Sequence, residues 1–140
     1  MGGIGEPGSA RKLRFVEHVG LHIERPAGGA GTCRLKVADR HFNATGVVHG
    51  GVLFTLVDTA MGAALYSTLE PAQLCATIEV KINYFKPVRE GTLVCTSVIV
   101  SKGKSVANLD ASVHVGDVLV ARANGSFAIF ARKGAAPQDL

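Results

Sequence analysis

One acidic residue, Asp58, lies inside the longest apolar stretch of the chain, Val52 to Leu69. Burying an unpaired carboxylate is costly, so its presence in such a segment needs a reason. One interpretation is catalytic, because desolvated carboxylates often occur at functional sites. The other is structural: Asp58 bonds a neighbouring backbone group, or it faces solvent on a partly exposed stripe. The residue alone leaves both interpretations open.

A glycine pair, Gly50 and Gly51, stands where this segment is predicted to become helical. The first amides of a helix have no partner within it, and a residue without a Cβ lets a ligand approach the backbone closely. These donors and the positive end of the helix dipole suit a carbonyl oxygen that gains negative charge. The pair therefore predicts an oxyanion hole in outline.

The spacing of these residues constrains how they can act together. Gly50 and Asp58 are eight residues apart, which corresponds to about 12 Å along one helix. A reacting carbonyl needs the donor and the carboxylate each within roughly 3 Å, so one helix does not easily supply both. Two antiparallel helices related by a two-fold axis can bring Gly50 of one chain beside Asp58 of the other. We therefore hypothesise an active site shared across a homodimer.

The elements that must position these residues follow from the hydrophobic periodicity. Apolar residues recur at helical spacing from Gly50 to about Leu69, where Glu70 and Pro71 end the segment. This helix has little polar surface, so it should be enclosed. Before it we expect a short helix, two strands and a loop, over 11–18, 21–25, 32–37 and 38–48. After it, alternation and short turns predict four strands, over 78–84, 94–100, 107–115 and 119–131.

The order of these elements fits one α+β domain in which an antiparallel sheet wraps around a single long central helix. For a chain of 140 residues we expect one domain over 11–133, with a mobile leader at 1–10 and a mobile tail at 134–140.

The net charge is +4 and the cations are scattered along the sequence, so nothing supports nucleic-acid binding. Three cysteines without a CxxC pair argue against a disulfide framework. We expect a cytoplasmic protein with no signal peptide and no membrane span.

One motif in the sequence is specific enough to indicate a protein family. The pattern Asn43-x5-His49-Gly50-Gly51-x6-Asp58, followed by the segment 77–84, closely resembles the hotdog-fold acyl-coenzyme A thioesterases of the phenylacetate-pathway type, over roughly residues 13–131. The His-Gly-Gly triplet alone would be a weak signal, whereas its spacing to Asp58 and the following strand is fairly specific. The resemblance implies a hotdog fold, hydrolysis of acyl-coenzyme A, and a homodimer that commonly pairs again into a tetramer. It implies no metal and no cofactor, since coenzyme A is part of the substrate.

The same resemblance implies roles for individual residues. The Gly50 amide would polarise the thioester carbonyl, and Asp58 of the facing subunit would act as general base or as nucleophile. Asn43 would hold the loop or the thioester, and His49 would support the loop and touch the substrate. Thr77 would position the attacking water. Two plainer alternatives remain: His49 can simply cap the helix start, and Asn43 can be a turn residue.

Further residues are candidates for substrate contact. Gly51 and several large side chains are candidates for the region around the acyl group: Phe54, Leu65, Tyr66, Tyr84 and Phe85. Polar residues near predicted turns are candidates to bind the coenzyme A phosphates, although exposed hairpin lysines are usually only solvated: Arg89, Lys102, Lys104 and Ser105. The cysteines are typical of packing residues: Cys33, Cys75 and Cys95. The remaining histidines show no metal-ligand spacing: His18, His22, His41 and His114.

Two competing functions are consistent with the same fold. A non-catalytic acyl-coenzyme A binding or sensing module would hold a thioester without releasing its thiol, and the presence of Asp58 opposes it. A hotdog dehydratase or hydratase needs a histidine paired with a carboxylate at a spacing that this chain does not show. The sequence Gly-x-Ser-x-Gly is absent, which argues against an α/β-hydrolase.

Overall fold

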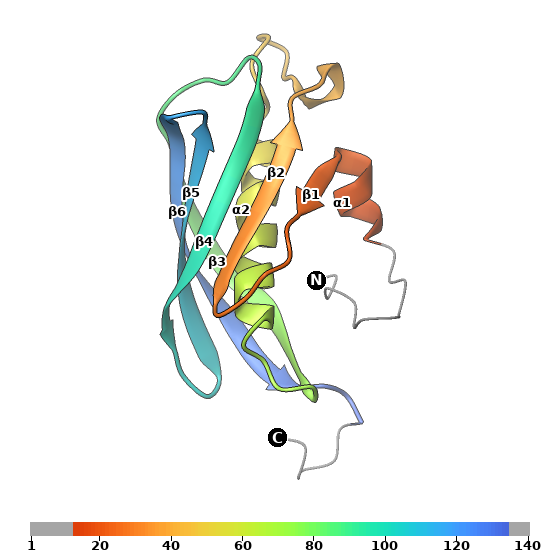
Figure 1. Cartoon of the computed structure of the whole chain (residues 1–140), viewed down its shortest axis with the longest axis vertical. Coiled ribbons are helices and arrows are strands. Elements are labelled where there is room, and N and C mark those ends of the chain that lie inside the picture. The colour runs from red at the N-terminus through yellow and green to blue at the C-terminus, as the bar shows by residue number, and fades with distance from the viewer. Residues whose placement is uncertain (1–12, 135–140) are drawn as a thin grey trace.

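The computed structural model describes residues 13–134, in which an antiparallel sheet curls around one long helix, α2 (Gly50–Tyr66) (Figure 1). Within these residues the sheet has six strands in the order β1-β2-β4-β5-β6-β3. The strand bounds are β1 Leu21–Ile23, β2 Ala30–Lys36, β3 Gln73–Tyr84, β4 Thr92–Lys102, β5 Val106–Val115 and β6 Val118–Ala131. A short helix, α1 (Arg14–Val19), precedes β1, and a single 3-10 turn, η1 (Asp39–His41), opens the loop before α2. The predicted hotdog arrangement is confirmed.

Some sequence-based expectations concern residues outside the described part of the chain. These are the leader at 1–10, the first two residues of the predicted helix over 11–18, and residues 135–140 of the expected tail.

Helix α2 is enclosed in its second half, as predicted, but Gly51 and Phe54 in its first half are exposed, and it ends at Tyr66 rather than near Leu69. The hydroxyls of Ser67 and Thr68 donate to the carbonyls of Ala64 and Leu65. Such local side-chain bonds compete with continuation of the helix. No helix among residues 13–134 is both long enough and apolar enough to cross a membrane.

The core lies between α2 and the concave face of the sheet. In β5 every second residue from Ala107 to Val113 is buried, as the alternation predicts. Strand β2 runs so close to the helix that a Cβ on Gly31 would lie 2.6 Å from the carbonyl oxygen of Ala60. A residue without a side chain is therefore required where the strand crosses α2. The largest fully buried side chains of the core include Leu35, Leu56, Met61, Leu93, Leu109 and Phe127.

Strand β3 differs most from its prediction, because it begins at Gln73 rather than at residue 78. Its register against β6 shifts between Thr77 and Glu79. A bulge at this point interrupts the simple alternation that the apolar residues had suggested, and the Ile78 side chain is 57% exposed. The early start and the bulge place Thr77 within the strand, opposite α2, where it reaches the helix.

Candidate active site

The structure brings Asp58 and Thr77 into direct contact. The Thr77 hydroxyl donates a hydrogen bond of 2.6 Å to Oδ1 of Asp58, from β3 to the middle of α2. Asp58 is partly exposed in the single chain rather than sealed in the core. This contact holds one carboxylate oxygen of Asp58 in a fixed position beside β3. The structural interpretation is confirmed only in part: Asp58 has some access to solvent, but its partner is the Thr77 side chain rather than a neighbouring backbone group.

Asn43 organises the loop that leads into α2. Its side-chain oxygen accepts hydrogen bonds from the Thr45 amide at 2.9 Å, the Thr45 hydroxyl at 2.9 Å and the Val47 amide at 3.2 Å. This is the local Asn-to-backbone pattern that makes asparagine common in turns. The turn role of Asn43 is therefore confirmed.

The backbone amides of the two glycines at the start of α2 differ in their hydrogen bonding. His49 is the N-cap, and its Nδ1 accepts the Gly51 amide proton at 2.8 Å. The neutral ring therefore carries its proton on Nε2. The capping alternative for His49 is confirmed, and the Gly51 amide is not the free donor that the sequence suggested. Gly50, whose amide has no recorded acceptor among the described residues, keeps the geometry of an oxyanion donor.

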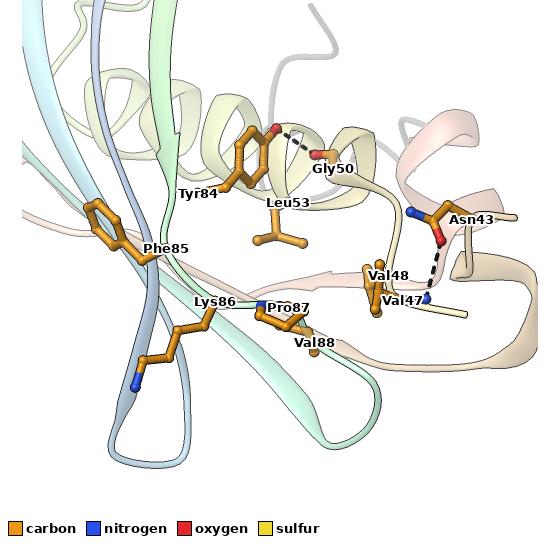
Figure 2. A pocket seen from close by; sticks show the side chains of 10 residues that line it. All are labelled: Asn43, Val47, Val48, Gly50, Leu53, Tyr84, Phe85, Lys86, Pro87 and Val88. Atoms are coloured by element: carbon orange, nitrogen blue, oxygen red, sulfur yellow. Dashed lines mark hydrogen bonds between the residues drawn. The ribbon is translucent and has the colours of Figure 1, made fainter. Parts of the chain in front are cut away.

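Tyr84 lies directly over Gly50, as Figure 2 shows. Its hydroxyl donates to the Gly50 carbonyl at 2.8 Å. A Cβ on Gly50 would meet the phenol ring at 3.2 Å, so the glycine permits this contact. Burial raises the pKa of Tyr84, which keeps the phenol protonated as a donor. The Tyr84 side chain therefore holds the first turn of α2 against the end of β3.

A cavity of about 360 Å³ opens beside this contact. It lies between the loop before α2, the first turn of the helix and the segment that follows β3 (Figure 2). Its wall combines apolar side chains with a nearly equal share of polar surface, with Asn43 at one side and the Gly50 backbone at another. A concave site in which apolar side chains surround fixed polar groups can bind a small molecule. The lining is Asn43, Val47, Val48, Gly50, Leu53, Tyr84, Phe85, Lys86, Pro87 and Val88.

Several of the predicted substrate contacts lie elsewhere. Leu65 is fully buried in the core, so its assignment to the pocket was wrong. Phe54 is 38% exposed on α2 and does not line this cavity. Tyr66 is partly buried in the last turn of the helix. Tyr84 and Phe85 do line the cavity, and both are about half exposed in the single chain.

The predicted phosphate-binding residues are separated in space. Lys102, Lys104 and Ser105 belong to the β4–β5 hairpin, and Lys102 Nζ donates to the Thr68 carbonyl just beyond the C-terminal end of α2. Gly50 lies at the other end of the same helix. Arg89, in contrast, follows β3 and lies close to the cavity in the chain segment 85–91. Within one chain, the structure therefore separates the hairpin residues from the Gly50 cavity.

The sequence interpretation missed the aliphatic part of the site. Val47, Val48 and Leu53 flank the motif residues, and Lys86, Pro87 and Val88 follow Tyr84 in the chain. The adjacency of these residues to the motif was the only signal in the sequence that could have identified them.

Cys75 lies near the Asp58 carboxylate. Burial raises the pKa of the Cys75 thiol, and the negative charge of Asp58 acts in the same direction. A thiol of this kind is a poor nucleophile, in agreement with a packing role.

Gly50 and Asp58 lie on the same helix. They are the first and the ninth residues of α2, so their separation along the axis is about 12 Å. This separation is too long for the Gly50 amide and the Asp58 carboxylate of one chain to contact the same carbonyl group. Within residues 13–134, no cluster of three or more His, Cys, Asp or Glu side chains is arranged to hold a metal ion.

A curled sheet around one helix, with a glycine at the helix start and an acid in its middle, matches the hotdog-fold thioesterases that the sequence motif resembles. Comparison with known proteins agrees. The family model described as the thioesterase superfamily matches residues 45–122. Human acyl-coenzyme A thioesterase 13 is 35% identical over 99 residues, which cover 69% of this chain and 70% of that protein. This chain belongs to the thioesterase superfamily.

Solved structures support the same assignment. Conserved protein PA5202 from Pseudomonas aeruginosa aligns with a TM-score of 0.83 and 35% identity, over 87% of this chain and 100% of that one. The phenylacetic acid degradation protein PaaI from Thermus thermophilus shares the fold, with a TM-score of 0.73 and 24% identity over 81% of this chain and 96% of that one. Thioester hydrolysis is the class of reaction that membership of the family supports.

Proposed function

We propose that this protein hydrolyses acyl-coenzyme A thioesters to the free acid and coenzyme A. The observation that carries the proposal is the Asp58 carboxylate held by the Thr77 hydroxyl at 2.6 Å. Membership of the thioesterase superfamily and the similarity to human acyl-coenzyme A thioesterase 13 support the choice of substrate class.

The proposed reaction uses protein groups and water. The Gly50 amide donates to the thioester carbonyl oxygen, and Asp58 takes a proton from a water that attacks the carbonyl carbon. Oxygen gains the negative charge of the tetrahedral intermediate, the carbon–sulfur bond then breaks, and the thiolate of coenzyme A leaves and is protonated. Thr77 acts as a positioning residue, because its bond to Oδ1 leaves Oδ2 for the water. Direct attack by Asp58 on the same carbon is the alternative route, through an anhydride that water opens.

We further propose that Gly50 and Asp58 of one site come from two subunits. Strand β3 supports a homodimer, because it is a 12-residue edge strand that pairs only with β6 within the described sheet. A long unpaired edge favours pairing with another chain. Apolar side chains also remain exposed near it, and Ile78, Tyr84, Phe85 and Phe54 are 57%, 50%, 51% and 38% exposed. A second copy that covers this edge would bury them. A dimer of such dimers is the further expectation.

The test of this function is hydrolysis of a panel of aryl and fatty acyl-coenzyme A substrates, followed by detection of the released thiol. We expect Asp58→Asn to lower kcat by roughly 10²-fold or more while substrate binding is largely kept, as for loss of a general base. A wild-type protein that binds acyl-coenzyme A tightly but releases no thiol would instead be a binding module. A near-normal rate for Asp58→Asn would refute the assigned role of the carboxylate.

A further inference from the structure

A buried histidine, His41, lies at the start of the loop that leads into α2, and the proposed reaction does not use it. Its side chain is only 3% exposed. Burying the polar nitrogens of a ring costs free energy unless each nitrogen has a hydrogen-bond partner. Nδ1 accepts the amide proton of Ala38 at 2.9 Å, and Nε2 lies 2.6 Å from the carbonyl oxygen of Val19. The His41 ring is therefore held on both sides inside the fold.

These two contacts fix the proton of the ring. A backbone N–H can only donate, so Nδ1 of His41 carries no proton and the neutral ring carries its proton on Nε2. Nε2 therefore donates to Val19, the last residue of α1, which packs against the hydrophobic core. This bond joins residues 22 positions apart, whereas the bond to Ala38 is local. Through Nε2, the loop is tied to a separate element of the fold.

The backbone of His41 closes the same loop next to Gly50. Its carbonyl oxygen accepts the His49 amide proton at 2.8 Å, and Phe42 forms a β-bridge with Val48 directly inside that bond. His41 and His49 thus form the base of the loop, and Gly50 follows His49 in the chain. Because the peptide unit between His49 and Gly50 is planar, the direction of the Gly50 N–H follows the position of His49.

His49 is also held from the helix side, because its Nδ1 accepts the Gly51 amide proton at 2.8 Å. A chain of hydrogen bonds therefore runs from Val19 through His41 and His49 to the first turn of α2. Loss of the His41 ring breaks this chain at its long-range bond and lets the base of the loop shift. A displacement of about 1 Å in a catalytic group can lower a rate by roughly 10²-fold.

We propose that His41 is a positioning residue for the oxyanion donor: its bond to Val19 holds the base of the loop and thereby directs the Gly50 amide at the thioester carbonyl. This inference rests on the proposed function, since it concerns the donor of the same site. An oxyanion donor acts mainly in the transition state, so the effect should appear in kcat rather than in KM. The loop keeps another tie, from the Val48 amide to the Val88 carbonyl at 2.8 Å, so the variants should still fold.

The test compares variants that keep one bond of the ring at a time, on the acyl-coenzyme A of the panel that the wild type hydrolyses fastest. His41→Leu removes both bonds, so we expect kcat to fall roughly tenfold or more with KM little changed. His41→Gln can place an amide N–H near the position of Nε2 and donate to Val19, so it should keep most of the rate. His41→Asn can accept from Ala38 but is too short to reach Val19, and it should be as impaired as His41→Leu.

Arg40→Met is the matched control. Arg40 Nη2 donates to the same Val19 carbonyl at 3.3 Å, but its side chain is exposed, and a bond of this length is weak. The Arg40→Met variant should therefore keep the wild-type kcat and KM.

A second measurement follows the amides themselves in ¹⁵N-labelled protein without substrate. In His41→Leu we expect faster exchange of the His49 amide proton and a shifted Gly50 amide resonance, and both should return toward the wild-type values in His41→Gln. Urea unfolding curves show which variants are folded. If His41→Leu does not fold, the comparison of His41→Gln with His41→Asn decides.

The proposal is overturned if folded His41→Leu keeps the wild-type kcat and loses only stability, or if His41→Gln is as impaired as His41→Asn. An unchanged Gly50 resonance in the His41→Leu and His41→Asn variants would overturn it as well. Failure of the proposed function looks different, because the wild type would then hydrolyse no acyl-coenzyme A, while the amide spectra still report whether His41 holds Gly50.

Discussion

The hydroxyl of Thr77 lies 2.6 Å from Oδ1 of Asp58, and it joins the bulged part of β3 to the middle of α2. The two residues are 19 positions apart in the chain. The contact fixes one carboxylate oxygen within a single subunit, so the orientation of the acid does not depend on a partner. The partner subunit is proposed to supply the backbone amide of Gly50, at the start of its own α2 helix.

The first prediction concerns this hydrogen bond. Thr77→Val keeps the shape of the side chain and removes the donor, so we expect kcat to fall roughly tenfold with KM little changed, because Asp58 loses its orientation. Thr77→Ser keeps the hydroxyl and should retain most of the rate. Steady-state kinetics on the preferred acyl-coenzyme A measure both. Equal activity of the Val and Ser variants would show that the bond does not position the carboxylate.

A second prediction concerns the helix cap. His49→Ala removes the acceptor for the Gly51 amide, and loss of an N-cap costs about 1 kcal/mol in the free energy of unfolding. His49→Asn can still accept that proton and should keep most of the stability. Urea unfolding curves of the three proteins make the comparison. If the Ala and Asn variants are equally stable, His49 does not act as a cap.

The third prediction uses the contact between Gly50 and Tyr84. A side chain at position 50 would meet the phenol ring at 3.2 Å, so Gly50→Val should lower kcat/KM by roughly tenfold or more through displacement of the first helical turn. Adding Tyr84→Ala removes the obstructing ring and should restore part of the loss, whereas adding Tyr84→Phe should not. A double-mutant cycle measures this coupling. Additive effects would contradict a steric conflict between the two positions.

A fourth prediction follows from the buried thiols. Cys33 and Cys95 face each other in the β2–β4 register and are fully buried. Burial, with a smaller effect of Glu24, raises the pKa of Cys33 from 9.0 to about 12, and burial also raises the pKa of Cys95. A raised pKa in the folded state stabilises the protein fully below the unfolded value, and this stability is lost as the pH rises through the folded value.

The wild-type free energy of unfolding should therefore fall between about pH 8 and about pH 10 by about 1 kcal/mol per thiol from this source. The double variant Cys33→Ala/Cys95→Ala lacks the two thiols and should show a smaller fall over the same range. Urea unfolding at both pH values gives the comparison. An equal pH dependence in the two proteins would show that these thiols ionise as easily when folded as when unfolded.

Much of the architecture was predictable because the elements follow from hydrophobic periodicity over short stretches of sequence. The helical spacing of apolar residues after Gly50 and the alternation of apolar residues around Leu109 indicate which face of each element is buried, and both patterns were confirmed. The contact between Thr77 and Asp58 was less predictable. It depends on the length of the link after α2 and on a bulge in β3, and a bulge leaves no simple periodic signal in one sequence.

Side-chain positions in three dimensions were the least predictable part of the site. Leu65 and Leu53 are both leucines of α2, yet only Leu53 lines the cavity and Leu65 is entirely in the core. Lys102 ends β4 and Lys86 follows β3. Only the three-dimensional structure shows that Lys86 lines the same cavity as Gly50. The bond from His49 to the Gly51 amide also required geometry, since the sequence suggests two equivalent glycines.

The fifth and most direct test mixes two impaired proteins, Gly50→Val and Asp58→Asn, after unfolding and refolding them together, and measures acyl-coenzyme A hydrolysis. A site shared by two subunits gives each mixed dimer one site with both residues intact, so an equal mixture should recover about a quarter of the wild-type rate, above the rate of either parent. Thr77→Val mixed with Asp58→Asn should recover no such activity, because those two residues act from the same chain. If native mass spectrometry shows that mixed dimers have formed and the Gly50→Val/Asp58→Asn mixture is no more active than the mean of its parents, the shared site is contradicted.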